Sequence, residues 1–381
     1  MTKYIYDLPD WPHFHWDHQR LAEKLAAVRH EQGRLLGRME NLGFPLRQRA
    51  VLDTLTTDVL KSSEIEGETL NMEMVRSSIA RRMGMEIGGL QAVDRAVEGV
   101  VEMMLDATGN YSQPLTAQRL FAWHSLLFPS GRSGMKTIRT GAWRTDSDGP
   151  MQVVSGPMGH ERVHFEAPAA LRVSGDMQAF LDWFNVSGNE DWVVKAALGH
   201  LWFVTIHPFE DGNGRIARAI ADMALARSEN SSQRFYSMSA QIRRERPAYY
   251  SGLEQTQRGT MDVTERLDWF LDCLGKAIEG AQTALSGVLA RSRFWDSIAV
   301  VNLNERQRLV LGRLLDNFEG KLTTSKWAKL AKCSQDTAAR DILALVERNI
   351  LARNLAGGRS TNYSLVQSGP SIGIPQPLAR K

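Results

Sequence analysis

Apolar residues recur at intervals of three and four along most of this chain, the spacing at which side chains share one face of an α-helix. Between Gly131 and Pro168 the pattern changes to alternation around a Gly-Pro-Met-Gly turn, which predicts a β-hairpin. The helical pattern predicts a helix of about 25 residues ending before Gly43, a second from near Leu46, and others over residues 71–82, 90–105, 115–127, 171–185, 192–205, 216–228, from 243, and from 263 to about 292. We therefore expect a mainly α fold with one inserted hairpin.

The C-terminal segment has a different pattern, with three short helices and then two strands. The helices are expected over 304–318, 324–331 and, after a Ser334 cap, to Glu347, with strands on either side of Gly357-Gly358. This order resembles a winged helix. Such modules bind DNA or dock proteins, and because the segment is not strongly basic, protein docking is slightly favoured. The candidate DNA contacts are Gln335, Thr337, Arg340, Arg353 and Arg359.

Composition limits the class of protein. A length of 381 residues exceeds one usual core, so two or three domains are expected. Hydrophobic content of 43% and charged content of 23% are ordinary for a soluble globular protein, and a net charge of +3 is too small to argue for nucleic-acid binding. No stretch approaches a membrane span and the N-terminus lacks the apolar centre of a signal peptide, so we expect a cytoplasmic protein.

The cysteines and several histidines offer no metal site. Cys273 and Cys333 each stand alone in predicted helices, so we expect buried, reduced thiols. His124 is expected to be packed or on the surface, and the spacing of His160 and His164 does not suggest a metal.

The stretch 206–218, Ile-His-Pro-Phe-Glu-Asp-Gly-Asn-Gly-Arg-Ile-Ala-Arg, carries the strongest chemical signal. Pro208 disfavours helical geometry at His207, and the Gly212-Asn213-Gly214 triplet favours a tight loop before a helix that begins near Gly214. Glycines permit positive φ and close backbone approach, so successive N–H groups can converge on an anion at the positive end of that helix. The loop is therefore predicted to hold polyphosphate.

Charged groups beside this loop suit the same ligand. Arg215 and Arg218 are three residues apart on one helical face and can each fork onto phosphate oxygens. Asp211 is suited to Mg²⁺, and His207 is the titratable group in the loop that can act as a base near neutral pH. The alternative is an ordinary helix corner with a surface histidine and two solvated arginines.

Every position of this stretch resembles the Fic-domain motif, His-x-Phe-x-Asp/Glu-Gly-Asn-Gly-Arg-x-x-Arg. The resemblance implies transfer of AMP from ATP to a Ser, Thr or Tyr hydroxyl of a target protein or of the chain itself. In that scheme His207 is the base, Asp211 holds Mg²⁺, and Arg215 steadies the leaving pyrophosphate. Gly212, Asn213 and Gly214 bind the α- and β-phosphates through backbone and side-chain donors, and Arg218 also belongs to the nucleotide site.

An upstream segment carries a second resemblance. Continuing the apolar stripe of the helix from Leu46 reaches Ser62 and Glu66, so Glu66 faces inward if the helix persists. Ser62, Glu66 and Gly67 fit the inhibitory motif of Fic proteins, Ser/Thr-x-x-x-Glu-Gly/Asn. The resemblance implies that Glu66 pairs with Arg218 and blocks the productive seat of the ATP γ-phosphate. A plain helix C-terminus with Gly67 as its left-handed cap fits the same residues, and both can hold.

Two further segments are assigned by the same resemblance. The hairpin 151–168 looks like the Fic flap, whose edge would hold a target segment by strand addition. Tyr249, Tyr250 and Gln257 match nucleotide-contacting positions, although the two rings could equally be a core edge. The nucleotide-binding set implied by the resemblance is Glu66, Val153, Val154, Ser155, His207, Gly212, Asn213, Gly214, Arg215, Arg218, Tyr249, Tyr250 and Gln257.

The expected organisation has four parts: an N-terminal helical region with the inhibitory motif over 1–110, a Fic catalytic core over 111–295, a winged-helix-like domain over 300–366 and a disordered tail over 367–381. Two other functions stay open: removal of AMP by a water that Glu66 orients, and a DNA-binding regulator whose Fic core senses ATP. Expected partners are a target protein on the hairpin and ATP, with a homodimer and DNA at 300–366 left open and no membrane.

Overall fold

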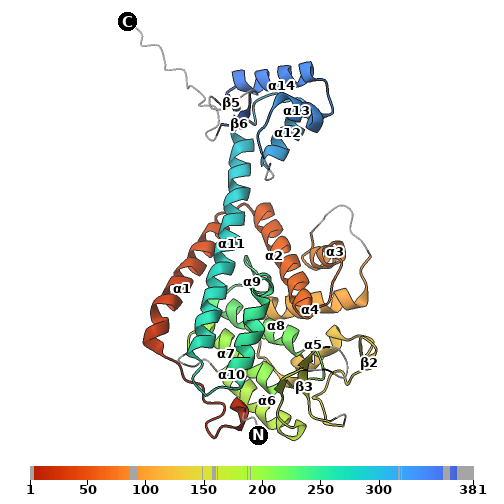
Figure 1. Cartoon of the computed structure of the whole chain (residues 1–381), viewed down its shortest axis with the longest axis vertical. Coiled ribbons are helices and arrows are strands. Elements are labelled where there is room, and N and C mark those ends of the chain that lie inside the picture. The colour runs from red at the N-terminus through yellow and green to blue at the C-terminus, as the bar shows by residue number, and fades with distance from the viewer. Residues whose placement is uncertain are drawn as a thin grey trace. The chain divides into compact units, whose positions relative to one another are not determined.

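The computed structural model describes residues 4–85, 92–147, 149–156, 160, 162–186, 188, 190–315, 318, 320–354 and 361–366. Two compact units are formed by Met1–Gln282 and Thr283–Lys381, and the division falls within one helix, Thr264–Ser297. Helices dominate the larger unit (Figure 1), which confirms the expected mainly α fold.

The elements of the larger unit follow the predicted order. After a short 3-10 turn at Ile5–Asp7, its helices are α1 (His18–Glu40), α2 (Phe44–Ile65), α3 (Met72–Arg82), α4 (Arg95–Gly109), α5 (Ala117–Leu127), α6 (Ala170–Asn185), α7 (Trp192–Ile206), α8 (Asn213–Glu229), α9 (Met238–Arg244), α10 (Arg246–Gln257) and α11 (Thr264–Ser297). The strands are β1 (Arg132–Ser133), β2 (Lys136–Thr137), β3 (Gln152–Ser155) and β4 (Arg162–Glu166).

Helices α7 and α8 form the centre of this unit. Every residue of α7 from Val193 to Ile206 is buried. A helix that is apolar on all sides needs packing partners on all sides. Helix α6 packs against α7, while α2, α4 and α5 pack against α8. The loop between the two central helices is thereby fixed at both ends.

Helix α1 lies beside the N-terminal part of α11, as Figure 1 shows. Lys24 on α1 is 2.6 Å from Asp268 and 2.9 Å from Asp272 on α11. These pairs join the N-terminal helical region to the end of the same unit.

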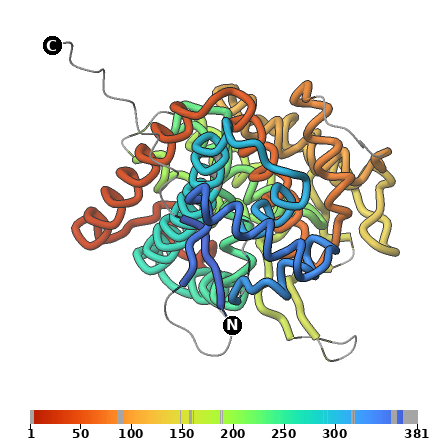
Figure 2. The backbone as a smooth tube through the Cα atoms, turned by 90° about the horizontal axis from the view of Figure 1, so that it is seen from above, coloured from red at the N-terminus to blue at the C-terminus, as the bar shows by residue number. Residues whose placement is uncertain are grey.

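The predicted hairpin is present as β3 and β4, whose strands run together at one edge of the view in Figure 2. Gln152 pairs with Glu166 and Ser155 with Arg162, with an irregularity in register between Val153 and Val154. The turn residues 157–159 lie outside the described residues. The small β1–β2 pair was not predicted.

Among the predicted helix boundaries that were wrong, local chemistry explains two. Helix α4 begins at Arg95 rather than Leu90 because the Asp94 side chain caps it by accepting from the Val97 N–H, 2.7 Å away. The helix expected from Arg243 is two helices, α9 and α10, because Pro247 is suited to the first turn of a new helix. Helix α2 ends at Ile65, one residue before Glu66. Residues 86–91, including most of the expected loop 83–89, lie outside the described part.

The two cysteines differ. Cys273 is buried in α11, as expected, and burial raises the pKa of its thiol to about 12. Cys333 is only half-buried and lies between α13 and α14 rather than inside a helix, so that prediction was wrong.

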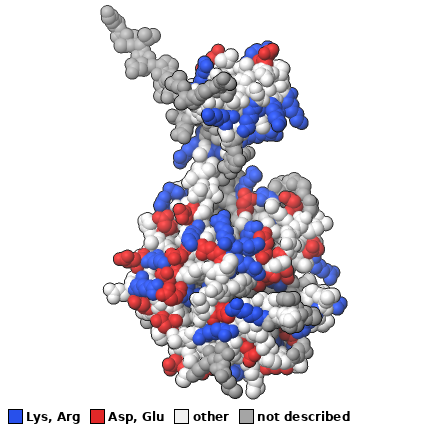
Figure 3. All heavy atoms as spheres, viewed as in Figure 1, with Lys and Arg blue, Asp and Glu red and all other residues white. Residues whose placement is uncertain are grey.

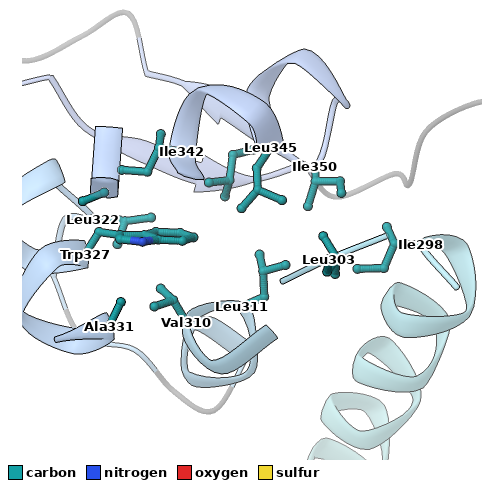
Figure 4. Close-up of a cluster of buried hydrophobic side chains, with 12 residues drawn as sticks. Ile298, Leu303, Val310, Leu311, Leu322, Trp327, Ala331, Ile342, Leu345 and Ile350 are labelled. Carbon is teal, nitrogen blue, oxygen red and sulfur yellow. The ribbon is translucent and has the colours of Figure 1, made fainter. Parts of the chain in front are cut away.

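The smaller unit has its own core. Its elements are α12 (Glu305–Leu315), α13 (Thr324–Ala331), α14 (Gln335–Glu347), β5 (Leu351–Arg353) and β6 (Tyr363–Leu365). Side chains from these helices point toward one another around the buried Trp327 (Figure 4). Ser334 caps α14 as predicted, accepting from the Thr337 N–H. The winged-helix resemblance and its partner stay predictions, and Gly357, Gly358, Arg359 and the tail 367–381 lie outside the described residues.

Acidic and basic side chains are interspersed over the face of the larger unit shown in Figure 3. Within the described residues, no helix combines the length and apolar character needed to cross a bilayer.

Candidate active site

The corner between α7 and α8 begins at His207. This residue ends α7 in the left-handed conformation, with φ 52° and ψ 58°, and its N–H donates to Phe203 O at 3.0 Å. A left-handed non-glycine residue is uncommon and turns the chain sharply. Pro208 follows it, as the sequence predicts for the end of a helix.

The loop after His207 is closed by Asn213. Its Oδ1 accepts from Phe209 N at 3.0 Å, and its Nδ2 donates to Phe209 O at 2.8 Å. The Oδ1 of Asn213 and one hydrogen of its Nδ2 are thus engaged inside the loop, and the phosphate contact that the resemblance implied stays a prediction. Phe209 is fully buried and stacks on His124, with ring centroids 4.2 Å apart. His124 is therefore packed, as expected.

The two glycines of the corner have different roles. Gly212 has φ +79°, and a Cβ there would lie 2.9 Å from the Phe128 ring. Gly214 already belongs to α8, so the expectation that both glycines serve positive φ holds only for Gly212. A Cβ on Gly214 would lie 2.2 Å from Glu66 Oε1. Glycine is required at position 214 because the Glu66 carboxylate lies where a Cβ would be.

The two arginines of the motif are buried and paired with carboxylates of one turn. Arg218, 2% exposed, is 2.7 Å from Glu66 Oε1, and Arg215, 3% exposed, is 2.5 Å from Glu68 Oε2. Burial lowers the pKa of Arg218, but the Glu66 carboxylate outweighs it and the net shift is upward. Neither guanidinium is solvated, which contradicts the ordinary-corner alternative.

Glu66 reaches Arg218 although the helix does not persist to it. Helix α2 ends at Ile65, and Gly67 has φ +87°. The Glu68 N–H donates back to Ser63 O at 3.0 Å. This is the glycine-capped helix end described as the alternative, and it delivers the carboxylate to the corner.

Ser62 supports the same arginine, because Arg218 Nε donates to its hydroxyl at 3.0 Å and Nη2 to its carbonyl at 2.8 Å. Glu64 lies elsewhere, pairing with Lys61 at 2.7 Å and Arg243 at 3.5 Å. The segment 62–68 is called the inhibitory turn below, after the Fic inhibitory motif that its sequence resembles; its role is a proposal.

A cavity of about 460 Å³ lies beside the corner and brings most of the predicted residues together. Nine predicted residues line it: Glu66, Val153, Val154, Ser155, His207, Gly214, Tyr249, Tyr250 and Gln257. Gly212, Asn213, Arg215, Arg218 and Asp211 are not on its wall, although Arg218 touches Glu66, which is.

His207 has the environment of a neutral base. Its Nδ1 lies 3.3 Å from Val204 O, and the tautomer that donates this hydrogen bond leaves Nε2 as an acceptor. Burial lowers the pKa of His207 to about 4, so the ring is uncharged near pH 7. Such a ring can take a proton from a hydroxyl.

Asp211 is the residue proposed for Mg²⁺. Its carboxylate accepts from Gly212 N at 2.6 Å and from the Ser133 hydroxyl, and it stays half-buried. In the part of the chain that the structure describes, three or more His, Cys, Asp or Glu nowhere gather as a metal site. Mg²⁺ needs no such set, since it binds through one or two carboxylates plus phosphates and water. The residues present therefore fit that ion.

The aromatic pair on α10 is divided between two roles. Tyr249 is 2% exposed and its hydroxyl is 3.0 Å from His200 Nε2. Tyr250 is half-buried and its hydroxyl lies 3.3 Å from Glu66 Oε2. Gln257 is buried, with Nε2 3.4 Å from Thr205 Oγ1. All three face the cavity, and Tyr250 also contacts the inhibitory turn.

Several cavity residues were missed by the sequence reasoning. Arg246, Leu253 and Glu254 lie three or four residues from Tyr249 or Tyr250 on α10, so helical spacing was a usable signal. His164 was considered only as a metal ligand. Glu68 belongs to no recognised motif. It lies three residues after the end of α2, and its contact with Arg215 on α8 joins segments far apart in the sequence.

Residues 114–225 match the Fic/DOC family, and residues 4–85 match a domain of unknown function (DUF4172). The chain carries a Fic domain. The corner and the hairpin lie inside this Fic domain, whereas the inhibitory turn lies in the segment of unknown function.

Relatives of the Fic domain include Protein adenylyltransferase Fic of Drosophila willistoni, 26% identical over 272 residues that cover 68% of this chain and 48% of that protein. A probable protein adenylyltransferase of Aquifex aeolicus (strain VF5) is 29% identical over 103 residues, 27% of this chain and 30% of that protein. The chain spans about half the length, or less, of the curated relatives it matches.

A solved structure shares the fold. A Fic family protein from Desulfovibrio desulfuricans G20 superposes with a TM-score of 0.51 at 21% identity, covering 91% of this chain and 97% of that chain. The helical architecture around the corner is therefore a Fic fold.

Proposed function

We propose that this chain transfers AMP from ATP to a Ser, Thr or Tyr hydroxyl of a target protein or of itself. One observation carries the proposal: neutral His207 faces a cavity of about 460 Å³ that also receives Gly214 at the start of α8 and the Tyr249–Tyr250 pair. The wall thus combines a base, a helix N-terminus and aromatic surface. Relatives named protein adenylyltransferases support it.

In this reaction the ATP phosphates lie against the backbone N–H groups at the start of α8. His207 Nε2 takes the proton of the target hydroxyl, whose oxygen forms a bond to the α-phosphorus. The bond from that phosphorus to the bridging oxygen breaks, and pyrophosphate leaves. Arg215 is suited to neutralise the departing charge, because among the described residues nothing accepts a hydrogen bond from its buried Nε.

Asp211 would hold Mg²⁺, which when bound supplies neutralisation of phosphate charge. The target would dock on the hairpin 151–168 by adding a strand to its edge. His164 O accepts from Arg258 Nη2 at 2.9 Å, so the hairpin is held against the end of α10.

The same turn that blocks the corner would regulate the enzyme. Glu66 pairs with Nη1 of Arg218 and Glu68 with Nη1 of Arg215, so each guanidinium is partly engaged by a carboxylate of the turn. Removing Glu66 frees Arg218 and should raise the fraction of enzyme that binds ATP productively. Each tenfold gain needs only about 1.4 kcal/mol.

Intact-mass analysis after incubation with ATP and Mg²⁺ tests both parts. The Glu66→Gly variant is expected to gain an adenylyl group well above wild type, while Glu64→Gly, whose carboxylate pairs with Lys61 and Arg243, should behave as wild type. No adenylyl gain on the protein or on lysate proteins would contradict the transfer. Equal gain in wild type and Glu66→Gly would contradict only the inhibition.

Removal of AMP is the second candidate, because the Glu66 carboxylate lines the cavity and could position a water. Adenylylated Glu66→Gly protein mixed with the wild-type chain and no ATP gives the test. Loss of the adenylyl group from the labelled protein would support removal, and an unchanged mass would count against it.

A further inference from the structure

Three side chains from three elements are joined by hydrogen bonds on the wall of the cavity. Ser155 Oγ on β3 is 2.6 Å from His164 Nε2 on β4, and His164 Nδ1 is 2.9 Å from Glu254 Oε2 on α10. Hydroxyl, imidazole and carboxylate in this order are the arrangement in which an oriented base takes a proton from a nucleophile.

The carboxylate at the end of this series is held in place. Glu254 lies 3.3 Å from Arg162 and 3.6 Å from Arg258, which neighbours it on α10. Its hydrogen bond with His164, followed by Arg162, holds the pKa of the Glu254 carboxyl below its usual value. A charged Glu254 keeps a proton on His164 Nδ1, so Nε2 faces the Ser155 hydroxyl as an acceptor.

Ser155 is also the hydroxyl best placed for reaction. Among the cavity-lining residues that the structure describes, three carry hydroxyls: Ser155, Tyr249 and Tyr250. Tyr249 is 2% exposed and engaged with His200. Burial raises the pKa of Tyr250, and its hydroxyl contacts the inhibitory turn at Ile65 O and Glu66. Ser155 is exposed and has an imidazole at its oxygen.

We propose that Ser155 is a self-modification site, at which the chain accepts AMP from ATP bound in its own cavity. The inference rests on the proposed function and names an acceptor for it. His164 Nε2 takes the Ser155 proton, Oγ forms a bond to the α-phosphorus, the bond to the bridging oxygen breaks, and pyrophosphate leaves. The product carries AMP on the hairpin strand expected to hold the target, so it limits further transfer.

Peptide mapping by mass spectrometry tests the site. The Glu66→Gly chain is incubated with ATP and Mg²⁺, digested, and the adenylyl group is expected on the peptide that contains Ser155. Ser155→Ala should remove that signal, and Ser155→Thr should retain it because a hydroxyl remains. His164→Gln should slow labelling at Ser155 by roughly a hundredfold, the lower contribution of a general base. Ser147→Ala, an exposed hydroxyl away from the cavity wall, is the matched control.

A label on Tyr250 or elsewhere that Ser155→Ala leaves unchanged overturns the acceptor while leaving the proposed function standing. An adenylyl group absent from every peptide and from every added protein overturns both. Labelling at Ser155 whose fractional rate rises with enzyme concentration would show transfer between chains and contradict use of its own cavity.

Discussion

The two parts of the candidate site, the α7–α8 corner and the inhibitory turn, are held in different ways. The corner is fixed by packing: Phe209 is fully buried, and Asn213 closes the loop with two hydrogen bonds. The inhibitory turn is buried at Ser62, Ser63 and Ile65. Its residues 66–68 are exposed, and ion pairs from Glu66 and Glu68 hold them to arginines of the corner. An ion pair with an exposed partner stabilises weakly, whereas loss of a buried hydrogen bond is costly.

The contrast between these contacts indicates which part of the candidate site can move. The backbone of the corner is held by contacts within the Fic domain, so we expect it to keep its shape when residues 66–68 move. We expect residues 66–68 to be the part that moves, because they are exposed, whereas Ser62, Ser63 and Ile65 of the same turn are buried.

The largest expected effect is on catalysis at the fixed corner. In the Glu66→Gly background, His207→Ala should lower the rate of AMP transfer to target by roughly a hundred- to ten-thousandfold, because the general base is lost. ATP binding, measured by calorimetry, should be retained. Loss of binding together with rate would show that His207 shapes the corner rather than serving as its base.

Asn213→Ala should be the most destabilising change in the corner. It leaves the buried N–H and C=O of Phe209 without partners, at roughly 2–5 kcal/mol in the free energy of unfolding. Denaturant titration measures the loss. Asn41→Ala, at an exposed helix end, should cost under about 1 kcal/mol and is the control. Equal losses would mean that the corner is not held as described.

Acid should destabilise the larger unit through two neutral histidines, His200 in α7 and His207 at its end. Burial lowers the pKa of His207 to about 4, and that of His200 falls well below its ordinary value. The unfolded chain therefore binds more protons below about pH 6.5. The contribution of neutral His207 to stability is full above that pH and is lost as the pH falls toward 4, at about 1.4 kcal/mol per pH unit.

Unfolding free energies at pH 7.5 and 5.5 test this sign. His207→Gln should flatten the pH dependence, and His30→Gln, which alters an exposed ring on α1, should not. A steeper dependence in His207→Gln than in wild type would contradict the assignment.

The smallest expected effect concerns the second carboxylate of the turn. Adding Glu68→Gln to Glu66→Gly frees Arg215 and should raise AMP transfer by up to about fivefold, since a pair with a 45% exposed partner contributes at most about 1 kcal/mol. Glu64→Gln in the same background is the matched control. Slower transfer in the Glu68 variant would mean that this residue assists the reaction.

The sequence predicted the corner well because its determinants are local. Pro208 and Gly212 constrain their own backbone, and Arg215 and Arg218 share a face by helical spacing alone. The hairpin and most helices followed for the same reason. Where a boundary depended on one side chain, as at the Asp94 cap of α4, periodicity placed it several residues away.

Contacts between distant segments could not be read from spacing. Arg215 meets Glu68 and His164 meets Glu254 because α2, β4, α8 and α10 pack together, and nothing in the neighbouring residues records that packing. The Glu66–Arg218 pair was anticipated only through resemblance to Fic motifs.

Gly214 shows how little room the corner leaves for change. The Glu66 carboxylate lies where a side chain at position 214 would be. In the proposed reaction an ATP phosphate would occupy the same space once Glu66 has moved away. A residue with a side chain at position 214 would crowd both the carboxylate and the phosphate. We therefore expect Glu66→Gly to release the proposed inhibition, and we expect every substitution at Gly214 to crowd the proposed phosphate site as well.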